Sequence, residues 1–274
     1  MIGGLALTGT ARAADIGSPR ERIVALAYDA GSSSLIEASP RALYRSRNDG
    51  RAWEAIALPT SIRHGSITSV AISANHQTLY VAGTGFGVLR SSDGGQHWIS
   101  KRMGLPAGAV VTVTAHADLP NTVYAYVAGK GVFRSEDAGD HWRLMDAGPR
   151  ERILQLVHSN MPGSMQTGWL FAATAKGVRR AMDCFCGWRD AGGLARNISA
   201  VAYDPRETRT IYAAAAAALL VSTDGGEHWS DLPAPGTPMT ALVVAPSGVL
   251  YAAVGDGELF RSTDHGHQWS RVDA

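Results

Sequence analysis

One eight-residue pattern returns along the whole chain and constrains its fold more than any other feature. It begins with Ser, carries Asp or Asn at its third position and Gly at its fifth, and ends with Trp. Five good copies span 46–53, 91–98, 135–142, 222–229 and 262–269, and a sixth at 181–188 keeps only Asp183 and Trp188. The closing Trp residues are 45, 44, 46, 41 and 40 residues apart. That period is typical of propeller blades and excludes most helical repeats.

Each period also carries the same strand pattern before its eight-residue copy. An alternating run such as 67–72 comes first, then an aromatic followed by small residues, as at Tyr80, then a run such as 87–90 that enters the copy. Apolar residues that alternate with a period of two favour half-buried strands, so these three runs are predicted strands. The Trp at the end of the copy begins a fourth strand. The sequence therefore predicts an all-β, six-bladed β-propeller of four-stranded antiparallel blades. We expect one domain over 14–274, with blades near 22–60, 66–105, 110–147, 153–192, 198–234 and 239–274.

The repeated pattern is best explained as the turn between the third and fourth strands of a blade. Ser and Asp side chains accept backbone N–H groups of a turn, Gly supplies positive φ, and Trp buries a large face. Six copies of one turn cannot each be an active site, so we interpret them as structural. The residues concerned are Ser46, Trp53, Ser91, Asp93, Gly95, Trp98, Ser135, Asp137, Gly139, Trp142, Asp183, Trp188, Ser222, Asp224, Gly226, Trp229, Ser262, Asp264, Gly266 and Trp269.

From about Arg22 to the C-terminus, these copies resemble the Asp box of the Asp-box, or BNR-repeat, β-propellers. That family includes sialidases, xyloglucan-type glycosidases, sortilin-like receptors and photosystem II assembly and stability factors. The chain is most similar in character to the last group, because it is short-looped and lacks the Arg-Ile-Pro signature of sialidases. Its nearest string is Arg22-Ile23-Val24. The resemblance implies a role in assembling, or staying attached to, a larger complex, although a shared fold does not settle function.

Composition excludes two broad classes of protein. The chain has 25 Lys and Arg against 24 Asp and Glu, so it shows no excess charge for nucleic-acid binding. It also has no run approaching the roughly 20 apolar residues of a membrane span. No phosphate or dinucleotide motif is present, and we predict no cofactor.

The first 13 residues, MIGGLALTGTARA, are small and apolar and end in the small-x-small pattern of a signal-peptidase site. They predict the remnant of a signal peptide, and hence a periplasmic or secreted protein. A frayed N-terminal tail is the alternative.

A basic rim is the predicted partner-binding surface. In a propeller the loops from strand 4 to the next strand 1, and from strand 2 to strand 3, share the face opposite the Asp boxes. Basic residues predicted in or beside these loops are Arg63, His64, Lys101, Arg102, Lys130, Arg150, Arg152, Lys176 and Arg196. We expect them to bind a protein partner through an acidic segment, or an acidic polymer. The alternative, ordinary solubilising charge, stays open, and the uncharged loop 232–238 favours it.

A sialidase-like or other glycoside hydrolase, acting on a polysaccharide or glycoconjugate, is the alternative function. Such chemistry needs two carboxyls roughly 5 to 10 Å apart. The acids considered are Glu37, which replaces a small or apolar strand residue of the other blades, with Asp256 and Glu258. Ring closure would bring blades 1 and 6 together. Most acids in such positions are structural, so we assign no catalytic residue and favour an interaction module over an enzyme.

Two short pairs consist of residue types that bind metals. Cys184 and Cys186 have no second Cys pair to complete a four-sulfur site, and one intervening residue strains a mutual disulfide. His265 and His267 flank a turn glycine and are left without a role. The sequence predicts no metal site.

Ring closure is the remaining expectation. The chain starts at strand 1 of blade 1 and ends at strand 4 of blade 6, so no strand is shared between the ends. We therefore expect blade packing to close the ring, helped by residues 14–21.

Overall fold

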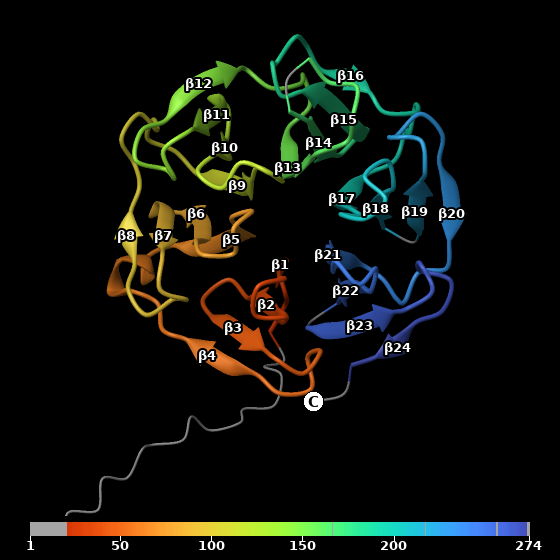
Figure 1. Cartoon of the computed structure of the whole chain (residues 1–274), viewed down its shortest axis with the longest axis horizontal. Coiled ribbons are helices and arrows are strands. Elements are labelled where there is room, and N and C mark those ends of the chain that lie inside the picture. Colours follow the sequence, from red (N-terminus) through yellow and green to blue (C-terminus); the bar gives the residue numbers. More distant parts are fainter. Residues whose placement is uncertain (1–20, 166, 217, 256, 273–274) are drawn as a thin grey trace, which may run out of the picture.

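The computed structural model describes residues 21–272 except 166, 217 and 256. Six four-stranded antiparallel sheets surround a central axis, and each uses four strands that are consecutive in sequence (Figure 1). The prediction of a six-bladed β-propeller is confirmed. Among the described residues, no helix has the length and apolar character needed to cross a membrane. The predicted signal-peptide remnant 1–13 and residues 14–20 lie outside the described chain.

The strands follow one another blade by blade. Blades 1 to 3 contain β1 (Ala25–Asp29), β2 (Ser34–Ala38), β3 (Leu43–Ser46), β4 (Glu54–Ile56); β5 (Ser66–Ile72), β6 (Leu79–Thr84), β7 (Gly87–Ser91), β8 (Ile99–Ser100); and β9 (Val110–Ala115), β10 (Val123–Val127), β11 (Gly131–Ser135), β12 (Arg143–Asp146). Blades 4 to 6 contain β13 (Ile153–Ser159), β14 (Trp169–Thr174), β15 (Gly177–Met182), β16 (Arg189–Asp190); β17 (Ile198–Tyr203), β18 (Ile211–Ala215), β19 (Leu219–Ser222), β20 (Ser230–Leu232); and β21 (Met239–Val244), β22 (Leu250–Val254), β23 (Glu258–Ser262), β24 (Ser270–Arg271). One 3-10 turn, Thr60–Ile62, precedes blade 2.

The hydrophobic core lies between neighbouring blades. The second strands are buried over their whole length in β2, β10, β18 and β22, because both faces of an inner strand meet another blade. The expected aromatic on the second strands of blades 2 to 6, such as Tyr80 or Phe171, is fully buried. Small residues beside it allow the blades to approach. A separate apolar cluster fills each of the six junctions.

Polar side chains of the innermost strands join one blade to the next. Ser69 Oγ donates to the Val113 carbonyl at 3.1 Å and accepts the Val113 N–H at 3.1 Å. Ser199 Oγ donates to the Met239 carbonyl at 2.8 Å. These groups are used within the ring, so fewer of them remain for a ligand on the axis.

The Asp boxes form the turns between third and fourth strands. In blade 2, Ser91 Oγ accepts the Gly95 N–H at 2.8 Å and donates to Asp93 Oδ1 at 2.8 Å. Asp93 accepts the His97 N–H at 2.9 Å and contacts the His97 ring at 2.6 Å. The His97 backbone and ring hold the pKa of Asp93 well below its usual range. Histidines before the box Trp therefore support the turn carboxylate.

Four arginines immediately before the boxes tie their own blade to the following one, and we call them clasp arginines. Arg90 Nη1 in blade 2 donates to the Ala138 carbonyl in the box of blade 3 at 2.9 Å. Equivalent hydrogen bonds link blades 1 to 2 and 4 to 5, through Arg45 and Arg180. Between blades 6 and 1, Arg261 Nη1 instead lies 3.9 Å from the carboxylate of Asp49. In blade 3, Arg134 pairs with Glu136 of its own box, and blade 5 has Val221 at this position. The three hydrogen bonds are charge-assisted, and each contact helps to hold a junction.

Blades 1 and 6 close the ring without a shared strand, as the order of the strands led us to expect. Their interface contains an apolar cluster, and Tyr251 Oη donates to Asp49 Oδ1 at 2.9 Å. Blade packing therefore closes the described ring.

Candidate functional site

The ring axis contains a pocket of about 490 Å³. Strand 1 of every blade and the adjoining strand 1 to strand 2 loops line it. None of the described lining residues is Asp, Glu, Lys or Arg; the polar ones are Ser, Thr, Tyr, Gln and three histidines. The described lining therefore contains neither an arginine cluster nor the two carboxyls of a glycosidase.

None of the nine predicted rim residues lines the axial pocket. Lys130 and Lys176 lie in strand 2 to strand 3 loops, whereas most of the others lie between blades. Two are engaged elsewhere: the Lys101 ammonium contacts Asp140 in the box of blade 3, and Arg196 Nη1 pairs with Asp231 Oδ1 at 2.7 Å.

Six of the predicted rim cations form what we call the basic arc. These side chains are exposed, lie in loops from blades 1 to 4, and make no ion pair within the described part of the chain; they are Arg63, Arg102, Lys130, Arg150, Arg152 and Lys176. His64 is exposed beside Arg63. The basic arc keeps its donors available to a ligand.

Acidic residues beside the basic arc already have partners. Glu151 accepts two bonds from Arg179, from Nε and Nη2, both at 3.1 Å. These bonds lower the pKa of Glu151. Asp146 Oδ1 accepts the Trp188 indole N–H at 2.9 Å. Arg179 and Trp188 therefore hold these acids, and the arc cations face no ion-pair partner among them.

Of the three acids predicted as weak catalytic candidates, the two described ones do not line the axial pocket. Glu37 on β2 is fully buried, and neither of its carboxyl oxygens has a hydrogen-bond partner. Burial raises the pKa of Glu37 to about 8, so it is protonated at neutral pH. Glu258 is exposed and pairs with Arg271 at 3.1 Å, and Asp256 lies outside the described residues. Neither Glu37 nor Glu258 lines the axial pocket.

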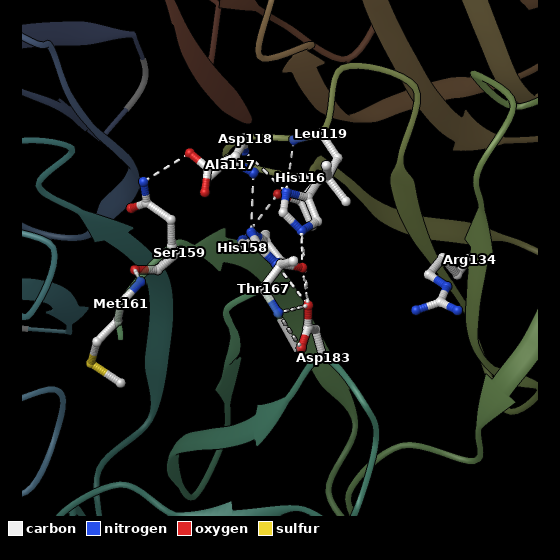
Figure 2. Close-up of polar contacts among 12 residues, drawn as sticks. His116, Ala117, Asp118, Leu119, Arg134, His158, Ser159, Met161, Thr167 and Asp183 are labelled. Carbon is white, nitrogen blue, oxygen red and sulfur yellow. Dashed lines mark hydrogen bonds and ion pairs between the residues drawn. The ribbon is translucent and has the colours of Figure 1, made fainter. Parts of the chain in front are cut away.

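A buried polar cluster that the sequence did not reveal lies between blades 3 and 4 (Figure 2). His116 follows β9, His158 lies on β13, and Asp183 follows β15. The Nε2 atoms of the two histidines are 3.8 and 3.9 Å from Asp183 Oδ2. Thr167 joins them: its Oγ1 is 2.7 Å from His116 Nε2 and donates to Asp183 Oδ2 at 2.6 Å. The side chains of His116, His158 and Asp183 are each at most 1% exposed.

Hydrogen-bond directions decide what this cluster can bind. His116 Nδ1 accepts the N–H groups of Asp118 and Leu119, and His158 Nδ1 accepts the N–H of Ala117, all at 3.0 Å. A neutral imidazole that accepts at Nδ1 must carry its proton at Nε2. A protonated nitrogen has no lone pair for a metal ion. One ligand atom from each of His116, His158 and Asp183 lies close enough to the others to share a metal ion. The hydrogen bonds to the histidine Nδ1 atoms nevertheless favour a hydrogen-bonded cluster without a metal.

The charge state of the cluster follows from the same bonds. Burial, followed by the charge of His158, lowers the pKa of His116 to about 4, which keeps the ring neutral at pH 7. Burial alone would raise the pKa of Asp183, but the nearby His158 ring and the hydrogen bonds from Thr167 lower it to about 2. Asp183 is thus an ionised carboxylate that accepts hydrogen bonds from Thr167. Because His116 Nε2 is a donor, it cannot accept a proton from Thr167 and so cannot activate the Thr167 hydroxyl as a nucleophile. The geometry instead suits a structural role, in which the cluster holds blades 3 and 4 together.

Asp183 marks where the box pattern fails. The other box aspartates accept bonds from their own turn, whereas Asp183 accepts the Thr167 N–H at 3.1 Å. A disulfide joins Cys184 and Cys186 in that turn, although the one-residue spacing argued against a mutual bridge. The retained Asp without its Ser and Gly was the available signal. His116 and His158 gave none, because their proximity depends on blade packing.

Comparisons with known proteins support the fold at low sequence identity. No protein-family model matches the chain, and no curated protein sequence does. A structure titled "YCF48 bound to D1 peptide" is 18% identical with a TM-score of 0.62, over 94% of this chain and 83% of that one. YCF48 from Cyanidioschyzon merolae is 17% identical with a TM-score of 0.63, over 95% and 90%. The GH74 xyloglucanase from Xanthomonas campestris is 20% identical with a TM-score of 0.65, over 92% of this chain and 47% of that one. The chain thus shares its propeller fold with both YCF48 and a xyloglucanase.

Proposed function

We propose that this propeller is a non-catalytic interaction module that binds an acidic segment of a protein partner, or of a larger complex, through the basic arc. The observation that carries the proposal is the set of six exposed cations without ion-pair partners in the described chain. Arginine forks bind carboxylates in a bidentate manner, and a one-sided charge distribution speeds the encounter with an acidic partner.

The uncharged axial pocket supports this function over hydrolysis. Its described lining has no carboxylate, and buried Glu37 has no acid beside it within hydrogen-bond distance. YCF48 bound to a D1 peptide is a precedent for peptide binding by a propeller of this fold. The xyloglucanase is a precedent for the alternative function, catalysis. A location in the periplasm or outside the cell remains part of the proposal, and cell fractionation of the full chain tests it.

A direct test measures binding of a fluorescent polyglutamate peptide by anisotropy over a series of salt concentrations. The variant Arg102→Ala/Arg150→Ala/Lys176→Ala removes three arc cations. We expect about tenfold weaker binding at low salt and a shallower salt dependence, since exposed pairs contribute about 0.2–1 kcal/mol each.

The matched control removes three exposed arginines outside the arc, Arg51, Arg143 and Arg271, and should leave binding within about twofold. Equal weakening in both variants would contradict the assignment of the surface. Release of sugar from sialosides or β-glucans by purified protein would favour the glycoside hydrolase alternative.

A further inference from the structure

The junction between blades 5 and 6 departs from the repeat at two facing positions. At the preceding junction, the clasp arginine Arg180 donates to the Gly225 carbonyl at 2.6 Å and contacts Glu227. Blade 5 has Val221 in place of the arginine, and the box of blade 6 has His267 in place of the glutamate. Both members of the ion pair are therefore missing from the same junction.

A cavity of about 570 Å³ lies at this junction. Its walls are the loop from β17 to β18, which belongs to blade 5, and the box turn of blade 6. Its lining includes Val221, Arg206, Arg209, Thr223, His265 and His267. His265 adopts φ of 61° at a box position where Gly94 and Gly225 stand in blades 2 and 5. The cavity is thus present where a clasp guanidinium would otherwise extend.

Positive charge dominates the lining of this cavity. The Arg206 guanidinium lies against Gly248 of blade 6, where a Cβ would be 1.7 Å from it. Arg206 Nε is 3.8 Å from Asp204 Oδ1, and its terminal nitrogens make no hydrogen bond to described residues. Arg209 is exposed and has no ion pair in the described chain. Glu207 is the single described acid of the lining.

We propose that this cavity is a binding site for a tetrahedral oxyanion, the phosphate or sulfate group of a small ligand. Guanidinium forks match such oxygens in a bidentate manner, and Thr hydroxyls and imidazole N–H groups supply further donors. The site lies on the face of the Asp boxes, because the strand 1 to strand 2 loops share that face with the box turns. It is therefore separate from the basic arc and independent of the proposed function.

Inorganic phosphate is the first probe, measured by thermal unfolding against sodium chloride of equal ionic strength, with calorimetry of binding in parallel. Glucose 6-phosphate is the second, because it separates a free anion from a phosphate ester. We expect a saturable rise in Tm of about 3 °C at roughly ten times Kd with at least one probe. No saturable binding of either probe would overturn the proposal.

Two variants locate the effect. Arg209→Ala should weaken probe binding about tenfold, because it removes a charged donor. Val221→Arg/His267→Glu rebuilds the pair seen between Arg180 and Glu227, and should fill the cavity and abolish the rise in Tm.

The variant of the basic arc described above should keep the full rise, as should Arg189→Ala, which alters an exposed arginine of β16. A rise that survives in Arg209→Ala and in the rebuilt junction, but disappears in the basic-arc variant, would overturn the assignment to this cavity.

Discussion

The junctions between blades 3 and 4 and between blades 6 and 1 both bury a carboxyl group, yet the two groups carry different charge. Asp183 is 1% exposed and accepts hydrogen bonds from Thr167, with two imidazole N–H groups nearby. Glu37 is fully buried beside the apolar cluster of the closing junction and has no donor. The pKa of Asp183 falls to about 2, whereas burial raises that of Glu37 to about 8.

The comparison shows that burial does not fix the charge of an acid. Desolvation opposes ionisation at both junctions, and only the donors around Asp183 overcome it. One junction is therefore held by an ionic anchor. The other tolerates a neutral acid that contributes no hydrogen bond of its own.

Asp183→Ala should produce the largest change. It removes the acceptor of two Thr167 bonds and leaves buried N–H groups unpaired, so we expect a loss of about 3 kcal/mol in the free energy of unfolding. Urea denaturation at pH 7 measures the loss. Asp264→Ala, at a partly exposed box aspartate, is the control and should cost less, and equal losses would remove the special role of Asp183.

Glu37→Leu should have the opposite sign. It replaces an unpartnered buried polar group by an apolar one of similar size, and we expect a gain of about 1 kcal/mol at pH 7. Wild-type stability should also fall as pH rises from about 4.5 through 8, because the unfolded chain ionises Glu37 first. The variant should lose that dependence. Denaturation from pH 5 to 9 decides the matter, and identical slopes would show that Glu37 ionises normally.

His116→Asn tests the pH response of the other junction. Because the folded pKa of His116 is about 4, below the unfolded value of about 6.5, the unfolded chain binds the proton first. Wild-type stability should therefore fall as pH drops from about 6.5 towards 4. The asparagine oxygen can accept the Asp118 and Leu119 N–H groups, so we expect a loss of about 1 kcal/mol at pH 7 and a flatter profile. An unchanged profile would exclude His116 as the titrating group.

Arg261→Met should have the smallest effect. The guanidinium is 3.9 Å from Asp49 across the closing junction, and both side chains are partly exposed. We expect a loss of about 0.5 kcal/mol that shrinks as salt is added. Chemical denaturation at low and high salt measures it. A loss as large as that of Asp183→Ala would mean that charge, rather than packing, closes the ring.

The repeat made most of the fold predictable. The spacing of the Trp residues and the alternation of apolar residues predicted the blades. They could do so because each regular box forms its turn from hydrogen bonds among neighbours in sequence, such as Ser91 with Gly95. The contacts of His116 with Thr167 and of Lys101 with Asp140 were out of reach, since they join residues 51 and 39 positions apart. The basic residues could be placed in loops from sequence. Whether a basic residue forms an ion pair, as Arg196 does with Asp231, depends on the neighbouring loop.

Every described blade is completed by its own stretch of chain, with no strand borrowed from the other end. No blade therefore depends on where around the ring the two chain ends lie. Joining the two ends by a linker and cutting the chain between any other two blades should give a circular permutant with all sheets intact. In such a protein the chain ends lie at a different junction, while the contacts between blades stay the same. Comparing permutants would therefore show which junction assembles last.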